Sequence, residues 1–127
     1  MYTKKLMDHF RSPRNLGEIK NPDSFAQIGN PVCGDVMKIY LNFVKNKKGE
    51  DLIKDIKFQT LGCAAAIATT SALTELAKGK TLKEALKIDR GKIAKHLGGL
   101  PPIKLHCSVL SQEVLKKAIK KWQKKSL

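Results

Sequence analysis

The sequence predicts an α+β fold, in which a small three-stranded antiparallel sheet is covered by helices, with one helix at the N-terminus and a long helix at the C-terminus. Two patterns predict this class. Residues 36–44 alternate apolar and polar side chains, which is typical of a half-buried strand. Residues 109–125 repeat apolar side chains at helical spacing and carry lysines on the opposite face. After the N-terminal helix the strands therefore follow one another directly and the remaining helices come after them, which is the order of an α+β fold.

The first elements are expected in the order helix, strand, strand, strand. Leu6, Met7 and Phe10 recur at helical spacing in a segment that ends at Ser12-Pro13, which predicts a helix over residues 2–11. After a loop over residues 15–23, the strands are expected at residues 25–28, 36–44 and 52–60. Residues 46–49 supply turn chemistry between the last two strands, so the sheet is expected to be an antiparallel meander.

Helices are expected to fill the rest of the chain. An alanine-rich helix covers residues 64–78 and ends at Gly79, which suits a C-cap. Thr81 and Glu84 form a capping-box pattern, and Asp89 can cap a third helix that ends near residues 98–99. Residues 100–102 are expected to be extended. The final helix over residues 109–125 is expected to bury one face and to expose the other: the first holds Leu115, Ala118, Ile119 and Trp122, and the second Lys116, Lys117, Lys120, Lys121 and Lys124.

The bulk properties predict a single domain over residues 1–127 that does not enter a membrane. The chain has 127 residues and no apolar run that could cross a bilayer. No secretory signal is recognisable at its start, so a reducing cytoplasmic location is expected. The formal net charge of +14 raises nucleic acid as a partner. Aromatic residues make up only 6% of the chain, which leaves few stacking platforms, and a solvated helix face is the simpler interpretation of the lysines.

The three cysteines carry the chemistry that the sequence suggests. Cys33, Cys63 and Cys107 each lie at a junction between predicted elements, which is where a scaffold places functional groups. Asp35 follows Cys33 across a glycine, and His106 precedes Cys107. Cys63 and Cys107 precede or begin helices, whose N–H groups and dipole favour a thiolate. Each cysteine by itself could equally be a small buried apolar residue, but the company of Asp35 and His106 favours metal binding or reactivity.

The remaining histidines are interpreted as structural or solvent-exposed. His9 lies beside an amphipathic stretch and His96 in a lysine-containing helix. Neither has a cysteine next to it in the sequence, so no site is expected at either.

Together the motifs resemble a known family. The stretches that carry the resemblance are residues 31–38 (PVCGDVMK), Gly62-Cys63 and residues 100–108 (LPPIKLHCS), supported by residues 2–17 and by the alanine-rich helix. They are similar to the IscU family and the N-terminal domain of NifU. The resemblance runs from end to end and agrees with the α+β fold inferred from the residue patterns.

The resemblance implies a scaffold, and not an enzyme, for assembly of a [2Fe-2S] cluster. Such a scaffold receives persulfide sulfur from a cysteine desulfurase, collects iron and passes the cluster to carriers or apo-recipients. The implied ligands of cluster, iron or zinc are Cys33, Asp35, Cys63, His106 and Cys107, with Cys107 as the first persulfide acceptor. Soft thiolates suit iron and sulfide, whereas a carboxylate such as Asp35 binds iron less tenaciously, so a mixed shell can hold a cluster without keeping it.

The resemblance also implies partners. The segment formed by Leu100, Pro101, Pro102, Ile103 and Lys104 is similar to the one that Hsp70/J-type chaperones grip to promote release of the cluster. The expected assembly is a monomer or a homodimer linked by the cluster.

Two other functions compete with this one. The same three thiolates with His106 or Asp35 also suit tetrahedral Zn²⁺, so the chain could be a zinc-binding sulfur acceptor, and zinc could occupy the scaffold when no cluster is bound. A basic nucleic-acid-binding protein is the weaker alternative, because it leaves the cysteines and His106 unexplained.

Overall fold

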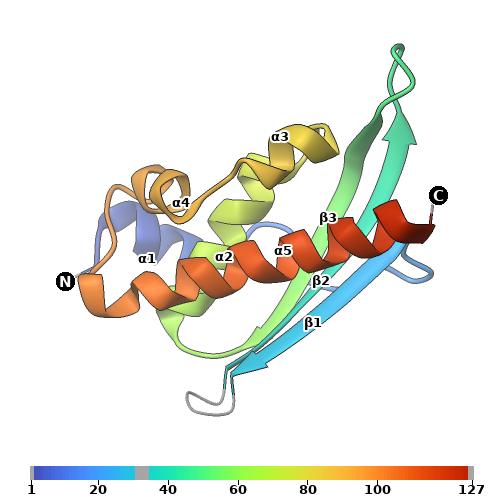
Figure 1. Ribbon diagram of the computed structural model, residues 1–127. Helices are drawn as coiled ribbons and strands as arrows, with labels where there is room; N and C mark the ends of the chain where they lie inside the picture. The colour runs from blue at the N-terminus through green and yellow to red at the C-terminus, as the bar shows by residue number, and fades with distance from the viewer. Residues whose placement is uncertain (1, 31–34, 126–127) are drawn as a thin grey trace.

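The computed structural model describes residues 2–30 and 35–125, except for the side chains of Asn30, Asp35, Ile103, Leu105 and His106. Its elements are α1 (Lys4–Arg11), β1 (Ser24–Asn30), β2 (Asp35–Lys45), β3 (Asp51–Leu61), α2 (Ala64–Ala77), α3 (Leu82–Leu86), α4 (Arg90–His96), a 3-10 turn (Pro102–Lys104) and α5 (Leu105–Lys125). Helices α2 and α5 pack against the sheet, and α1 and α4 lie beyond them, far from the tip of the β2–β3 hairpin (Figure 1). The predicted α+β class, with its long C-terminal helix, is confirmed.

The sheet is the predicted antiparallel meander, in the order β1-β2-β3. The alternation read from β2 holds, since Met37, Ile39 and Leu41 are buried beneath the helices. On the opposite face Tyr40 packs against Phe25, with 5.0 Å between ring centroids. Burial on one face only is what fixes the register of such a sheet.

An irregularity in the β2–β3 ladder was not predicted. The register steps from Asn42↔Asp55 to Phe43↔Ile53, so Lys54 is an extra residue on β3. A bulge of this kind changes which face the following side chains occupy. As a result Ile53 and Ile56, three residues apart, are both fully buried, where strict alternation would place them on opposite faces.

Helix α2 is the centre of the helical layer. It packs against α1, α4, α5 and β3, and ten of its residues are buried. Small side chains dominate it (AAAIATTSALTELA), which lets four neighbouring elements approach its backbone. The helix ends at Ala77, after which Gly79 adopts a φ of 82°, as the predicted glycine C-cap requires.

The caps of the short helices follow the sequence signals. Thr81 and Glu84 form a reciprocal capping box at the start of α3, and the side chain of Asp89 accepts a hydrogen bond from the Lys92 N–H at the start of α4. Gly98 and Gly99, with φ values of 76° and 122°, lie just beyond α4. The chain can therefore turn sharply there before it reaches α5.

Helix α5 crosses the face of the sheet (Figure 1). Leu115, Ala118 and Ile119 are buried as predicted, and Trp122 packs on Phe43 at 4.8 Å between centroids. The Trp122 Nε1–H also donates to Asp51 Oδ2 at 2.9 Å. That hydrogen bond and the neighbouring Lys45 lower the pKa of Asp51. The lysine face points outward, as expected for a solvated helix face.

The start of α5 differs from the prediction. The helix begins at Leu105, four residues before the predicted start at residue 109, and the 3-10 turn Pro102–Lys104 leads directly into it. Residues 100–102 were expected to be extended, but Pro102 belongs to that turn. Proline is compatible with a first helical turn, because its fixed φ near −65° is helical and its missing N–H needs no partner there.

Three elements meet at one buried contact. The hydroxyls of Thr70 in α2 and Ser111 in α5 lie 2.8 Å apart, and each lies 3.8 Å from Met37 Sδ in β2. Each hydroxyl also lies within hydrogen-bonding distance of a carbonyl in its own helix, Thr70 Oγ1 2.8 Å from Ala66 O and Ser111 Oγ 3.0 Å from Cys107 O. One of the two can therefore donate to its carbonyl while the other donates across the contact. All three side chains are at most 1% exposed. We call Met37, Thr70 and Ser111 the buried triad.

Replacing Ser111 with Ala should lower the free energy of unfolding by about 1 kcal/mol, the usual net value of a buried hydrogen bond. The loss arises because Thr70 loses the Ser111 hydroxyl and keeps only Ala66 O and Met37 Sδ, and because Cys107 O loses its Ser111 donor. Urea denaturation followed by circular dichroism measures the change. Lys120→Ala, on the exposed face of the same helix, is the control and should stay within about 0.5 kcal/mol of the unsubstituted protein.

Candidate functional site

Two of the five predicted ligands lie where the structure describes their side chains. Cys63 and Cys107 can be placed, whereas Cys33 and the side chains of Asp35 and His106 lie outside the described residues. The backbone does fix where the neighbouring segments lie: β2 begins at Asp35, and His106 is in the first turn of α5.

Cys63 occupies the N-cap of α2, with φ −78° and ψ 174°. Its side chain makes no capping hydrogen bond, and the residue is partly exposed. The N-terminal end of a helix favours negative charge, because its first N–H groups point outward without partners in the helix. A thiol at this position can therefore meet an incoming ligand at the positive end of a 14-residue helix.

Cys107 lies inside the first turn of α5 and is fully buried. Ser111, one turn later, donates to its carbonyl oxygen at 3.0 Å. The sequence prediction placed Cys107 at or before the start of the helix. Because the helix starts earlier, the thiol faces the core in this conformation and is covered.

The segments that carry Cys63 and Cys107 lie near the end of the sheet where β2 begins. Val36, near the start of β2, pairs with Leu61 at the end of β3, two residues before Cys63. The buried triad then ties β2 and α2 to the first turns of α5. In Figure 1 the end of β1, the start of β2, the β3–α2 connection and the start of α5 all lie in the same half of the molecule, opposite the hairpin tip. We call this region the cysteine end.

An exposed apolar surface adjoins the cysteine end. Leu61 exposes 73% of its surface, unusually much for a leucine at the end of a strand. Together with Val36, Lys38, Gln59 and Thr60 it lines a shallow cavity of about 270 Å³. An exposed leucine beside a candidate site is a feature that partner-binding surfaces share.

The segment predicted to bind a chaperone leads into α5. Leu100 and Pro101 are half-buried, Pro102 is exposed, and Lys104 is partly exposed at the end of the 3-10 turn. The side chain of Ile103 lies outside the described residues. The segment is therefore accessible in part, and its C-terminal end is continuous with the helix that holds Cys107.

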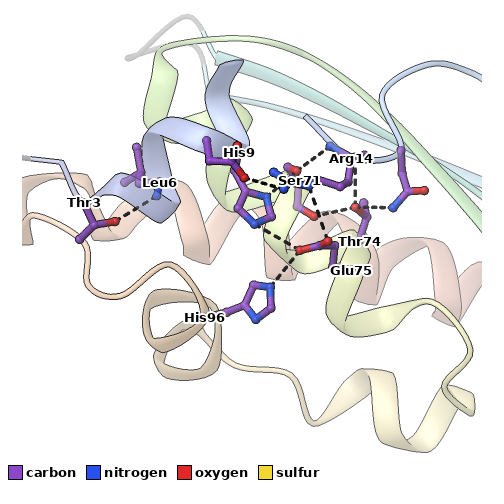
Figure 2. Close-up of polar contacts among 10 residues, drawn as sticks. Thr3, Leu6, His9, Arg14, Ser71, Thr74, Glu75 and His96 are labelled. Atoms are coloured by element: carbon purple, nitrogen blue, oxygen red, sulfur yellow. Dashed lines mark hydrogen bonds and ion pairs between the residues drawn. The ribbon is translucent and has the colours of Figure 1, made fainter. Parts of the chain in front are cut away.

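A second polar cluster lies on the other side of α2. Glu75 Oε1 is 3.2 Å from His9 Nε2 and 3.0 Å from His96 Nε2, and His9 Nδ1 is 2.8 Å from Ser71 Oγ (Figure 2). Arg14 joins the cluster through its backbone N–H, which donates to Ser71 Oγ at 2.8 Å. The side chains come from α1, α2, α4 and the segment that follows α1.

The surroundings of His9 favour its neutral form. Burial lowers the pKa of His9 below its ordinary value of 6.5, and the positive charge of Arg14 lowers it further, while Glu75 acts in the opposite direction. The guanidinium of Arg14 is shared by two carboxylates, with Nη2 2.5 Å from Asp8 Oδ2 and Nε 3.7 Å from Glu75 Oε2. These contacts lower the pKa of Asp8.

Comparison with known proteins assigns the family. The model of the NifU-like N terminal domain matches residues 1–127. The chain belongs to the NifU-like N-terminal domain family. The resemblance to the IscU and NifU proteins that the cysteine motifs suggested is thereby confirmed.

Curated relatives of this family member carry assembly-scaffold names. "Iron-sulfur cluster assembly scaffold protein IscU 1" of Archaeoglobus fulgidus is 56% identical over 119 residues, which are 94% of this chain and 74% of that protein. The scaffold protein IscU of Aquifex aeolicus is 45% identical with the same coverage. "Iron sulfur cluster assembly protein 1, mitochondrial" of Debaryomyces hansenii is 46% identical over 98% of this chain and 69% of that protein.

Solved structures agree on the fold. A putative scaffold protein for the SUF system from Fervidobacterium islandicum superposes with a TM-score of 0.73 at 25% identity and covers 93% of this chain and 96% of that one. The N-terminal part of a NifU-like protein from Brucella abortus gives 0.74 at 18% identity over 97% and 94% of the two chains, and at that identity it supports the fold alone.

Sequence reasoning missed the cluster of His9, Glu75 and His96. His9, Glu75 and His96 were not predicted to meet, because they are 66 and 21 residues apart and share no motif. His9 is buried, as a structural role requires, and His96 is about a third exposed.

No helix among residues 2–30 and 35–125 is long and apolar enough to cross a membrane. The cytoplasmic location stays a prediction.

We expect Cys63 to react with a thiol reagent such as DTNB more than about tenfold faster than Cys107 in the metal-free protein. Cys107 is fully buried, so it reacts only while the structure around it is open. If that local opening costs about 1.4 kcal/mol, the open state is about tenfold less populated and the reaction is slower by the same factor. Quenched alkylation with peptide mass mapping assigns the rate to each cysteine. Equal rates for both in folded protein would contradict the burial of Cys107, and the rate in urea provides the unprotected reference.

Proposed function

We propose that this chain is a scaffold on which a [2Fe-2S] cluster is assembled from iron and desulfurase-derived sulfur, and from which it passes to recipient proteins. One observation carries the proposal: in a NifU-like N-terminal domain, Cys63 follows β3 at the end of the sheet where β2 begins, and the buried triad ties α2 and the Cys107-bearing start of α5 to β2. Relatives named as assembly scaffolds support it.

The proposed ligands are Cys33, Cys63 and Cys107, with Asp35 and His106 completing the shell at different stages. Thiolates are the donors that iron–sulfur clusters use, and a cluster ligated by thiolates carries negative charge. Cys63, at the N-cap of α2, is placed where the helix dipole favours that charge. Asp35 and His106 add a hard and an intermediate donor, which bind iron less firmly than thiolate and so allow release.

The proposed sulfur transfer begins at Cys107. Its thiolate attacks the outer sulfur of a persulfide on the desulfurase; the S–S bond of the donor breaks, the donor cysteine leaves as a thiolate, and Cys107 now carries the persulfide. No net oxidation occurs in this exchange. Reduction of each bound sulfur to sulfide then takes two electrons, which an external thiol or ferredoxin-type reductant supplies. Because Cys107 is buried, the desulfurase must engage a conformation in which the first turn of α5 has opened.

The partners follow from the same surfaces. A cysteine desulfurase and cluster recipients need access to the cysteine end, where Leu61 offers an exposed apolar contact. An Hsp70/J-type chaperone would bind residues 100–104, whose distortion acts directly on the first turn of α5. In this role the chain binds and hands on its cargo and does not turn over a substrate. The zinc-binding sulfur acceptor remains the alternative, since the same donors suit Zn²⁺.

Anaerobic incubation with ferrous iron, cysteine, a desulfurase and a reductant should give the visible absorption of a [2Fe-2S] cluster. Replacing Cys33, Cys63 or Cys107 singly by Ala should abolish or sharply reduce that absorption, because each substitution removes a thiolate ligand. Lys120→Ala serves as the control and should load like the unsubstituted protein. Full cluster yield in all three cysteine variants would refute the ligand assignment, whereas zinc binding without any cluster would favour the sulfur-acceptor alternative.

Asp35→Ala should give a cluster that transfers more slowly to an acceptor apo-ferredoxin. A carboxylate can leave the iron shell more readily than a thiolate and gives incoming ligands a polar approach, so its loss should make the cluster less labile. If Asp35 instead only stabilises the turn after Cys33, the variant should lose its cluster faster. Decay of the chromophore with and without acceptor distinguishes the two outcomes. Asp55→Ala, a carboxylate on β3 away from the cysteine end, is the matched control.

A further inference from the structure

His9, Glu75 and His96 bring three metal-binding side chains together away from the cysteines. Their ligand atoms, the two Nε2 atoms and Glu75 Oε1, all lie within 4.8 Å of one another. The side chains belong to α1, α2 and α4 (Figure 2). Among the residues that the structure describes, His, Cys, Asp and Glu form no second group of this kind.

The ring of His9 is held in the orientation that a ligand needs. It is 5% exposed, and Ser71 Oγ lies 2.8 Å from Nδ1, which leaves Nε2 directed at Glu75. Metal-binding histidines commonly have such a partner on the other ring nitrogen. A hydroxyl can donate or accept, so Ser71 can donate to Nδ1 when Nε2–H bonds Glu75 and can accept from Nδ1–H when Nε2 binds a metal.

The distances require little rearrangement. A tetrahedral ion with bonds of about 2.0–2.1 Å separates neighbouring ligand atoms by about 3.3 Å. Glu75 Oε1 already lies 3.2 Å and 3.0 Å from the two imidazole nitrogens. Only the two nitrogens need to approach each other, and the His96 side chain is 36% exposed, so it can turn without disturbing the core.

We propose that His9, Glu75 and His96 form a second metal site that binds a divalent transition-metal ion, Zn²⁺ or Fe²⁺, independently of the cysteine end. Two imidazoles and one carboxylate are a donor set that both ions accept, and neither Mg²⁺ nor Ca²⁺ favours imidazole. The remaining coordination positions open into a cavity of about 590 Å³ lined by His9, His96 and the side chains of Lys5, Lys92 and Lys95.

The basic lining determines what completes the site. Arg14 Nε lies 3.7 Å from Glu75 Oε2, and Lys5, Lys92 and Lys95 add positive charge around the cavity. Among the described residues that line the cavity, the one acidic residue, Asp8, is paired with Arg14, so the lysines leave a net positive charge. These charges oppose a bare dication and attract anions. The exogenous ligand is therefore an anion such as chloride or phosphate rather than water alone, and the affinity is lower than that of a three-thiolate site.

The test uses protein purified without a histidine tag and with Cys33, Cys63 and Cys107 replaced by Ala, so that no thiolate competes. Calorimetric titration with Zn²⁺, and with Co²⁺ as a spectroscopic probe, should give one equivalent of bound metal. Removing a residue that only hydrogen-bonds to a metal ligand usually weakens metal binding by about 10–100-fold. His96→Ala and Glu75→Gln remove proposed ligands themselves, so each should weaken binding by more than about tenfold. Zn²⁺ should also raise the melting temperature of the parent protein and not of these variants.

Two controls separate this site from general electrostatics. Glu113→Gln, a carboxylate on the lysine face of α5, should leave the affinity unchanged. Lys95→Gln removes a positive charge from the cavity lining and should tighten binding. If His96→Ala, Glu75→Gln, Glu113→Gln and Lys95→Gln all changed the Zn²⁺ affinity by the same factor, the ion would bind the surface nonspecifically. That result would refute the site.

A measurement on the unsubstituted protein covers the case in which the cysteine-free protein does not fold. After one equivalent of Zn²⁺ has occupied the cysteines, a second equivalent should shift the Nε2 resonances of His9 and His96 in long-range ¹⁵N spectra, with Nδ1 of His9 protonated. Unmoved Nε2 resonances, or affinities unaffected by His96→Ala and Glu75→Gln, would overturn the proposal. No readout involves an assembled cluster, so the result is independent of the scaffold function.

Discussion

The arrangement of this molecule depends on the burial of α2, in which ten of fourteen residues are buried. A helix enclosed by α1, α4, α5 and the sheet needs small side chains, and the alanines, threonines and serine of α2 meet that need. Hydroxyls in such a place must be paired, because an unsatisfied buried polar group costs about 1–3 kcal/mol. Thr70 is paired with Ser111 and with Ala66 O, and this pairing fixes the rotation of α5 against α2. The position of Cys107 relative to Cys63 follows from that rotation, since each residue is within two turns of the triad.

The opposite side of the same helix organises the other polar cluster. Ser71 and Glu75 are one turn apart, so they lie on one face, and α1 and α4 deliver His9 and His96 to that face. The segment after α1 is fastened there as well, through the bond from the Arg14 N–H to Ser71. One buried helix therefore orients the cysteine end on one side and the His9–Glu75–His96 cluster on the other.

How far the sequence predicts these features depends on whether a local pattern encodes them. The three strands, the Gly79 C-cap, the Thr81–Glu84 box and the lysine face of α5 all leave periodic or spacing signals, and each was predicted correctly. The bulge at Lys54 was not predicted, because Ile53 and Ile56 fit a strand only once a register shift is allowed. The start of α5 was placed too late because Pro101-Pro102 was interpreted as extended chain. The His9–Glu75–His96 cluster results from tertiary packing alone, so no local sequence pattern could indicate it.

The contrast between Cys63 and Cys107 imposes a condition on any function of the cysteine end. A partly exposed thiol at the start of α2 can meet a partner directly, whereas the fully buried Cys107 can do so only if the first turn of α5 opens. Local opening of a helix end is inexpensive compared with global unfolding. The bond from Ser111 to Cys107 O and the burial of the thiol set that cost. Residues 100–104, which we propose as a chaperone-binding segment, adjoin this turn. A binding event at this segment would couple to Cys107 through continuous backbone, so access to the thiol can be controlled without disturbing the sheet or α2.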